Sequence, residues 1–346
     1  MNEIVLFRQS DLDSLDELQE CKKHFRTTFS RTLCLEEVVI GRYSVLPYYT
    51  ELENDLRLQG SKLINDYSQH RYIANFDYYE DIAHLTFPTW FDTMASVPMS
   101  ENGPFVVKGR TNSRKQEWGT RMYAKDRADA VKIQCSLLTD SLIGQQGIVF
   151  RKYIPLKKLG ENGVTGQPFV NEWRAFYYKK VQLALGYYWS IAEEDTQKKA
   201  MLDDKAHELL ANVSSILADK VNFYCVDIAQ KEDGDWIVVE VNDGQMAGLP
   251  YNQMAAQLYS KLKMALEVEK GPKKWWVLTK AGCIGASPYN TKEEAEAFIP
   301  VALAHPTWNY HKDELSIVES AEKPMCYYDV LLRQGRYNHE AIPLDT

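Results

Sequence analysis

The sequence is most informative between residues 225 and 242, where it runs Cys225-Val226-Asp227-Ile228-Ala229-Gln230-Lys231-Glu232-Asp233-Gly234-Asp235-Trp236-Ile237-Val238-Val239-Glu240-Val241-Asn242. Two runs of alternating apolar residues, 225–229 and 237–242, flank the dipeptide Asp233-Gly234. Asp-Gly between such runs is a strong hairpin signal, because both central residues of a type I′ turn need a positive φ. We therefore predict a β-hairpin with a type I′ turn at this dipeptide.

Folding the chain about this turn leaves one face of the hairpin apolar and puts acidic residues on the other. The expected facing pairs are Asp227 with Glu240, Val226 with Val241, and Ile228 with Val239. Directly opposed carboxylates would lie roughly 5 Å apart and repel each other. Asp227, Glu240 and Asn242 on one rigid face suit a hard cation, and magnesium is usual where phosphates complete its shell. The alternative is a hairpin whose acids simply face solvent.

Composition and charge narrow the class of protein. With 346 residues the chain can form two or three domains, and its hydrophobic content of 45% and charged content of 25% are ordinary for a globular protein. The formal net charge of -8 argues against a general nucleic-acid or membrane-surface binder, although a local basic patch stays possible.

The cysteines and the lengths of the apolar runs indicate where in the cell the protein is located. The six cysteines are scattered without a Cys-x-x-Cys pair, which is typical of reduced thiols and not of a disulfide framework or a zinc site. The first residues lack the plan of a signal peptide, and no apolar run approaches the roughly 20 residues of a membrane helix. We expect a soluble, cytoplasmic protein without a membrane partner.

Composition shifts and breakers predict four segments: 1–100, 101–155, 156–270 and 271–346, the last set off by Gly271-Pro272. The expected strands are Glu3–Phe7, Glu36–Gly41, Phe105–Val107, Gly147–Pro155, Phe169–Tyr178 and Val181–Ser190. The expected helices are Lys205–Lys220, Asn252–Val268, Thr291–Ala302 and one with Ala128, Val131, Cys135, Leu138 and Leu142 on its apolar stripe. Residues 156–168 are expected to be a loop because they contain four glycines or prolines.

The order of these parts along the chain resembles that of a known fold. A strand ends in Lys108, a basic loop follows, another strand ends in an apolar-aromatic segment, Glu172-Trp173-Arg174 lies on a later strand, and the acidic hairpin completes the set. Over roughly residues 100–265 this resembles the ATP-grasp fold, in which two α+β lobes hold ATP. The acidic motif resembles the magnesium motif of D-alanine–D-alanine ligases and of ribosomal-protein glutamate ligases.

The segment Arg42-Tyr43-Ser44-Val45-Leu46-Pro47 and the order of basic residues resemble, more narrowly, the clade named for two arginines and a lysine. The resemblance implies an α+β protein of ATP-grasp fold. An α/β domain over 1–100 would precede the two lobes, 101–155 and 156–270, and a small accessory domain over 271–346 would follow them.

The resemblance assigns the phosphate-binding side of the site. Lys108, at a strand end, would contact phosphate as a fixed positive charge. The loop Gly109–Lys115 lies where the family has a mobile phosphate-covering loop, so Ser113 and Lys115 would bind the triphosphate. This loop contains less glycine than is usual in the family. A solvated basic face is the alternative.

The adenine and ribose contacts are assigned in the same way. The backbone of Lys152, Tyr153 and Ile154 would bind the base, although many family members have a glutamate where Arg151 or Lys152 stands. Glu172 would contact the ribose hydroxyls. Arg174, two residues further on and so on the same strand face, would reach the phosphates or an acyl phosphate through its planar fork. The alternative for Glu172 and Arg174 is a cross-strand surface pair.

One family feature has no clean match, namely a basic residue that precedes the first lobe and contacts the α-phosphate. We take Arg71, in the pair His70-Arg71, as the candidate. Arg42 is a candidate for a residue that points from the N-terminal domain toward the acceptor substrate.

Together these assignments predict an ATP-dependent ligase that joins a carboxylate to an amine through an acyl phosphate. Its cofactors would be ATP and Mg²⁺, with the metal held by Asp227, Glu240 and Asn242 and with Lys108 and Arg174 as catalytic residues. A kinase-like phosphotransferase and a nucleotide-binding module without turnover are the alternatives, and acidity argues against action on nucleic-acid ends. The sequence does not identify the acid, the amine or the oligomeric state, nor whether the acceptor is a small molecule or a protein.

Overall fold

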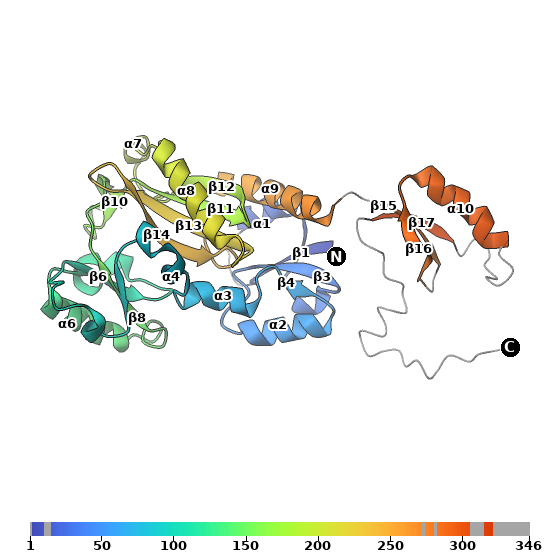
Figure 1. Ribbon diagram of the computed structural model, residues 1–346. Coiled ribbons are helices and arrows are strands. Elements are labelled where there is room, and N and C mark those ends of the chain that lie inside the picture. Colours follow the sequence, from blue (N-terminus) through green and yellow to red (C-terminus); the bar gives the residue numbers. More distant parts are fainter. Residues whose placement is uncertain (1, 10–14, 272–273, 280–281, 305–314, 321–346) are drawn as a thin grey trace.

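The computed structural model describes residues 2–9, 15–271, 274–279, 282–304 and 315–320. An N-terminal sheet of parallel strands opens the chain, in the order β2-β1-β3-β4 (Figure 1). Its strands are β1 (Asn2–Phe7), β2 (Arg26–Thr28), β3 (Glu37–Arg42) and β4 (Lys62–Leu63). Parallel strands need crossover connections, and α1 (Leu15–Cys21) and α2 (Tyr49–Leu58) supply them. Both strands expected in this region are confirmed to within one residue at each end.

A small antiparallel sheet follows, in the order β5-β8-β6-β7. Its strands are β5 (Thr89–Phe91), β6 (Phe105–Gly109), β7 (Tyr123–Ala124) and β8 (Ile148–Lys152). The helices α5 (Trp118–Arg121) and α6 (Arg127–Leu138) pack on it, while α3 (Tyr67–Ala74) and α4 (Tyr78–Ile82) precede it in the chain. One face packs on α6, since Phe105, Val107 and Phe150 share a core with Ile133 and Leu137. The other face carries Val106, Lys108 and Arg151, because side chains alternate along a strand.

The apolar stripe expected on α6 is wrong. Val131 and Leu138 are 43% and 52% exposed, whereas the helix buries Ala130, Ile133 and Leu137. This second set has the same helical periodicity, so spacing alone could not choose between the two faces. Leu142, which was expected on the stripe, lies beyond the last residue of the helix.

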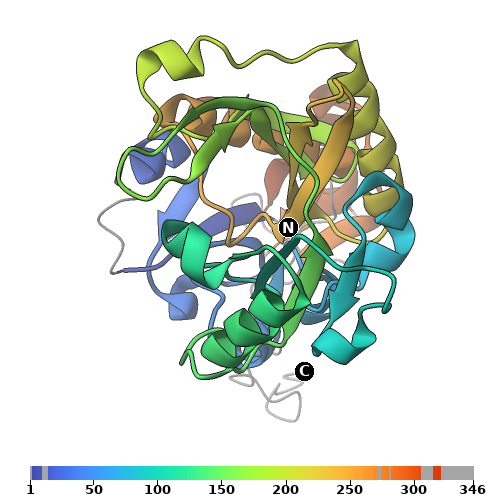
Figure 2. The same cartoon turned by 90° about the vertical axis from the view of Figure 1, so that its left-hand side faces the viewer.

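A large antiparallel sheet has the order β12-β11-β13-β14. Its strands are β11 (Glu172–Tyr178), β12 (Val181–Tyr187), β13 (Phe223–Gln230) and β14 (Trp236–Asp243). The helix α8 (Asp204–Leu217) covers one face and α9 (Asn252–Lys270) covers the other, while α7 (Glu194–Gln197) lies in the connection before α8 (Figures 1 and 2). The core under α9 continues into the N-terminal sheet through Val5, Phe7 and Ile40, so one hydrophobic interface holds the two sheets together.

Two expectations at the start of this region are wrong. Residues 156–168 contain a hairpin, formed by β9 (Lys158–Glu161) and β10 (Pro168–Val170), because the glycines at 163 and 166 lie in its turn. The strand expected over 169–178 is divided at Asn171, whose side chain binds the backbone of Met201 and the indole of Trp173.

The acidic hairpin is confirmed with a different turn. Asp227 pairs with Glu240 and Val226 with Val241, as expected. Ile228 pairs with Val238 instead of Val239, because a β-bulge shifts the register there. The type I′ turn is wrong: Gly234 has a φ of +92°, Asp233 is not in the positive-φ region, and the Gly234 amide donates to the Lys231 carbonyl across 3.0 Å. The two strands therefore meet through a longer connection.

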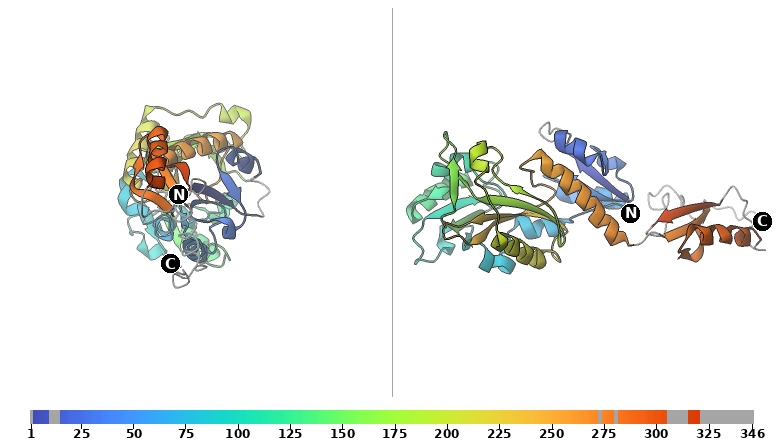
Figure 3. Two further views of the ribbon diagram at one scale, coloured as in Figure 1. Left: turned by 90° about the vertical axis from the view of Figure 1, so that its right-hand side faces the viewer. Right: turned by 90° about the horizontal axis from the view of Figure 1, so that it is seen from above.

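A C-terminal unit follows the end of α9 (Figures 1 and 3). Its elements are β15 (Lys274–Thr279), β16 (Gly282–Tyr289), α10 (Lys292–Ala304) and β17 (Ser316–Ser320), with the strand order β16-β15-β17. The four segment boundaries stay predictions, and much of 305–346 lies outside the described residues. Within the described part of the chain, no helix is both long and apolar enough to span a membrane.

Candidate active site

An ion pair joins the small sheet to the large sheet. Lys108, on β6, places its Nζ 2.6 Å from Oε2 of Glu240 on β14. The Lys108 residue is only 6% exposed, so little water screens the pair. Burial opposes ionisation of Glu240, but the charges of Lys108 and Lys115 outweigh it and hold the pKa of that carboxyl well below its usual range.

A second ion pair lies beside the first. The register of β11 and β13 places Arg174 opposite Asp227, and the guanidinium binds the carboxylate with both Nε–Oδ1 and NH2–Oδ2 at 2.7 Å. Asp227 is fully buried. The NH2 group of Arg174 also lies 4.0 Å from Oε1 of Glu240. The two opposed carboxylates of the hairpin are thus compensated by cations from two other strands.

Two of the three expected metal ligands are in direct contact. Nδ2 of Asn242 donates to Oε1 of Glu240 across 3.0 Å. In the described part of the chain, no three His, Cys, Asp or Glu side chains converge as a metal site would require. Mg²⁺ often takes only one or two carboxylates and fills its shell with phosphate oxygens and water. Each carboxylate oxygen has two lone pairs, so Asp227 and Glu240 fit such a site without losing their present partners.

A cavity of about 210 Å³ lies between the two sheets at this point. Most of the expected nucleotide-binding residues line it, namely Lys108, Ser113, Lys115, Lys152, Tyr153, Ile154 and Glu172, and so does Glu240, an expected metal ligand. Apolar side chains such as Val106, Leu156 and Val170 complete its wall. A mostly apolar wall with a few convergent polar groups is typical of a small-molecule site.

The segment expected to bind adenine is partly engaged by the protein itself. The amide of Lys152 donates to the Pro88 carbonyl and that of Tyr153 to the Pro104 carbonyl, each across 2.9 Å. The backbone amide of Tyr153 is therefore already bonded within the protein. The next amide along the chain that could bind the base is that of Ile154. The Lys152 side chain pairs with Glu101 at 3.1 Å.

Lys115 connects the basic loop to the large sheet. Its Nζ donates to the hydroxyl of Tyr188 across 2.6 Å and lies 4.3 Å from the centre of that ring. Burial opposes the charge of this ammonium, but Tyr188 and Glu172 raise its pKa above the usual value. The loop thus places a cation over the cavity.

Glu172 has the properties of a ligand-binding carboxyl. It is 3% exposed, and among the described residues no hydrogen-bond partner reaches its Oε1. Burial raises the pKa of Glu172 to about 7, against the opposing charge of Lys115. A buried acceptor without a partner is costly unless a bound molecule supplies a donor, so ribose hydroxyls fit this position.

Two candidate arginines lie elsewhere. Arg71 is exposed on α3 and does not line the cavity, so the structure does not bring it to the site. Arg42 is fully buried, and its guanidinium binds protein groups, so it does not point toward a substrate.

Arg151 lines the cavity although the sequence did not assign it a role. Its NH2 donates to Thr86 Oγ1 across 2.7 Å and its NH1 to the Val239 carbonyl in the bulge before Glu240. The alternation of side chains along β8 could have indicated that Arg151 faces the cavity. Because Phe150 points into the core, the next side chain lies on the opposite face of the sheet.

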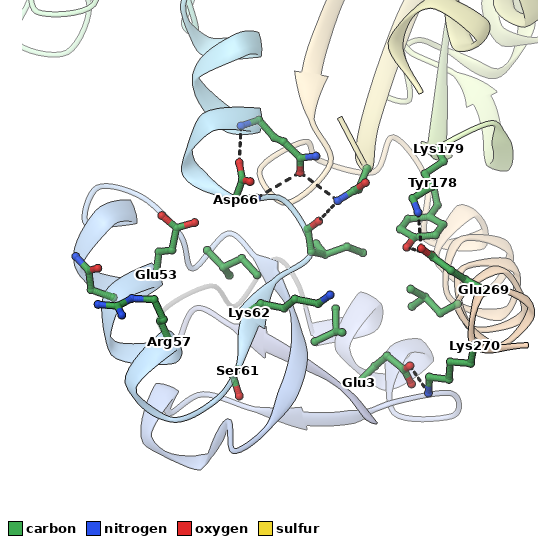
Figure 4. A pocket seen from close by; sticks show the side chains of 17 residues that line it. Glu3, Glu53, Arg57, Ser61, Lys62, Asp66, Tyr178, Lys179, Glu269 and Lys270 are labelled. Carbon is green, nitrogen blue, oxygen red and sulfur yellow. Dashed lines mark hydrogen bonds and ion pairs between the residues drawn. The ribbon is translucent and has the colours of Figure 1, made fainter. Parts of the chain in front are cut away.

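Another cavity, of about 710 Å³, is lined by other residues (Figure 4). None of the expected site residues lines it. Its charged side chains largely bind one another, as Glu3 does Lys270 and as Glu269 does Tyr178 and Lys179. It is not a second candidate for the nucleotide.

Comparison with known proteins agrees with this geometry. Residues 97–262 match a family model of the ATP-grasp domain, that of family 3 in the clade named for two arginines and a lysine. The solved D-cycloserine synthetase DcsG is 15% identical with a TM-score of 0.51, covering 76% of this chain and 99% of its own. A RimK-domain ATP-grasp protein from Sphaerobacter thermophilus is 11% identical with a TM-score of 0.49, covering 75% and 98%.

The macrocyclase MdnC from Microcystis aeruginosa, solved with a precursor peptide, is also 11% identical; its TM-score is 0.47, with 76% and 99% covered. No curated protein matches the chain. At 15% identity the likeness to D-cycloserine synthetase concerns the fold alone, and it confirms the expected α+β class. Over residues 97–262, just under half of its length, the chain has an ATP-grasp domain, and this segment matches the model of family 3 in the clade that the sequence resembled.

Proposed function

We propose that this protein is an ATP-dependent ligase that joins a carboxylate to an amine with release of ADP and phosphate. The observation that supports it is the charge arrangement at and beside the cavity. Lys108 and Glu240 form an ion pair in its wall, Arg174 and Asp227 form a second pair next to that one, and Glu172 and Lys115 also line the cavity. Fixed opposite charges around a small cavity suit a phosphoryl group together with its counter-ions.

The nucleotide has a defined orientation in this proposal. The base lies against Ile154 and the apolar wall, and the ribose hydroxyls donate to Glu172. The phosphates run toward Lys108 under the basic loop, where Lys115 adds charge from above. Glu240, Asp227 and Asn242 would hold the metal, which would supply Lewis-acid stabilisation of the phosphate oxygens.

The reaction then needs positioning more than a protein nucleophile. A substrate carboxylate oxygen attacks the γ-phosphorus, and the bond to the bridging oxygen of ADP breaks. The amine nitrogen of the second substrate attacks the acyl carbon, phosphate leaves, and the nitrogen loses a proton. We assign to the N–H groups of Arg174 that bind neither Asp227 nor Gly248 the role of holding oxygens of the acyl phosphate, while Lys108 would hold those of ADP.

Hydroxylamine provides the test, because it converts acyl phosphates into stable hydroxamates. The protein is incubated with Mg·ATP, hydroxylamine and a mixture of amino acids and dicarboxylic acids. We expect hydroxamate, ADP and phosphate to accumulate in equal amounts. ADP together with a stable phosphorylated acceptor would instead identify a phosphotransferase. Nucleotide binding without any ADP would identify a binding module.

Location is proposed on separate grounds. Cys21, Cys34, Cys135 and Cys225 are free thiols, which supports the reducing cytoplasm. The carboxylate and the amine, and whether either belongs to a protein, are decided by the assay.

A further inference from the structure

Arg42 uses its guanidinium to hold the loop that follows the acidic hairpin. The residue ends β3 of the N-terminal sheet and is fully buried. Its NH1 donates to the carbonyl of Gly244, and its NH2 donates to the carbonyl of Ala247 across 3.1 Å. These two carbonyls belong to the turn that leads from β14 into α9. One side chain thus holds the loop 244–248 at two of its carbonyls.

The charge of Arg42 is compensated away from the loop. Nε donates to Oε1 of Glu17 across 2.7 Å, and Glu17 also accepts from the hydroxyls of Tyr43 at 2.8 Å and Tyr259 at 2.5 Å. Because α1 supplies Glu17, the guanidinium is anchored to that helix, and Tyr259 of α9 is connected to it only through Glu17. A planar fork anchored on one side can present its other donors in a fixed direction.

The same loop reaches the candidate active site at its other end. NH1 of Arg174 donates to the carbonyl of Gly248 across 2.9 Å, while its remaining donors hold Asp227. The loop begins shortly after Asn242, whose side chain binds Glu240. A change in the loop would therefore move Arg174 and Asn242, and would leave Lys115 and Glu172 in place.

We propose that Arg42 is a positioning residue, which sets the loop 244–248 so that Arg174 and Asn242 meet the transferring phosphoryl group. This inference rests on the proposed function. The positioning role gives the N-terminal sheet a part in catalysis, although Arg42 itself does not contact the substrate. Arg42 orients the reacting groups, whereas nucleotide binding depends on other elements.

Arg42→Lys tests the proposal because it keeps the buried charge for Glu17 and loses the fork to the two carbonyls. Turnover in the hydroxylamine assay should fall at least about tenfold, since small misplacements of reacting groups cost that much or more. The affinity for ADP measured without Mg²⁺ should stay within about twofold, because the base and ribose contacts do not involve the loop in this account.

Tyr259→Phe is the matched control. It removes one hydrogen bond from the same Glu17 and touches no loop carbonyl, so Tm should fall while turnover of the folded protein stays unchanged. If Arg42→Lys does not fold, Gln245→Ala takes its place, because the Gln245 side chain binds Gly41 and Tyr49 and carries no charge. We expect the same loss of turnover with unchanged ADP affinity.

Hydrogen exchange of the loop amides separates this inference from the proposed function. Exchange over 244–250 should be at least about tenfold faster in the Arg42→Lys protein than in the wild type, with Tyr259→Phe unchanged. A wild type without ATP turnover would refute the ligase, and exchange would still decide whether Arg42 holds the loop. Equal exchange in all proteins, or wild-type turnover in Arg42→Lys, would overturn the positioning role.

Discussion

The Nζ atom of Lys108 lies 2.6 Å from Oε2 of Glu240, so the expected phosphate-binding cation and the expected metal-binding carboxylate neutralise each other. The pair spans two sheets that come together only in the folded chain. When a magnesium nucleotide binds, phosphate oxygens would contact Lys108 and the metal ion would contact Glu240. Both charges would then keep a counter-charge throughout, which lowers the cost of burying them.

Glu240→Ala should leave the fold intact and lower ATP turnover by about a hundredfold or more, since a preorganised electrostatic contact is removed. The single variant leaves the ammonium of Lys108 buried without a counter-charge, so its Tm should also fall. The double variant Lys108→Met/Glu240→Leu should recover most of that Tm but none of the turnover. Circular dichroism and ADP release measure the two effects, and a turnover that survives in Glu240→Ala would refute the metal assignment.

Arg174→Lys should separate charge from geometry. The lysine keeps a positive charge beside Asp227 but loses the bidentate contact and the bond to the Gly248 carbonyl. Hydrogen bonds to charged groups contribute about 1.5–3 kcal/mol each, so we expect a measurable loss of stability in urea together with a larger fall in turnover. The exposed pair of Lys205 with Asp235 offers the control: Lys205→Met should change neither value appreciably. Wild-type kinetics in Arg174→Lys would remove this arginine from the mechanism.

The hairpin shows what the sequence could predict. Alternation and Asp-Gly were sufficient to bring Asp227 opposite Glu240, because both signals are local. They could not predict the bulge at Val239, whose carbonyl accepts a hydrogen bond from Arg151, a tertiary contact that the local pattern does not contain. For the same reason the stripe on α6 was assigned to the wrong face: two sets of residues have helical spacing, and the small sheet decides which is buried.

The arginines show the corresponding limit for the site. The order of motifs brought Lys115, Glu172 and Ile154 to one cavity, but it gave no information on which arginine is buried. Arg42 is buried and Arg71 is exposed because of where their strand and helix lie in the fold. The position of Arg42 depends on its ion pair with Glu17, which is distant from Arg42 in the sequence. Buried charge partners are set by packing, and sequence periodicity does not encode them.

Magnesium and nucleotide should stabilise the protein jointly. At an ADP concentration one hundred times its dissociation constant, with Mg²⁺ present, the free energy of unfolding should rise by about 2.7 kcal/mol. EDTA should reduce the accompanying rise in Tm, since Glu240 and the phosphates would then meet without a cation between them. Thermal denaturation with ADP, Mg·ADP and Mg²⁺ alone makes the comparison. Identical curves in all three would contradict the assignment of the cavity to a magnesium nucleotide.

Glu172 should make the stability of the unliganded protein depend on pH. Burial raises its pKa from 4.5 to about 7, so the folded protein holds a proton there that the unfolded chain releases above about 4.5. Its contribution is therefore fully present below pH 4.5 and is lost as the pH rises through about 7. Glu172→Gln, which cannot ionise, should match the wild type in urea denaturation at pH 5 and be the more stable protein at pH 8. A difference between the two proteins that stays constant from pH 5 to pH 8 would show that Glu172 is ionised throughout, already paired with Lys115.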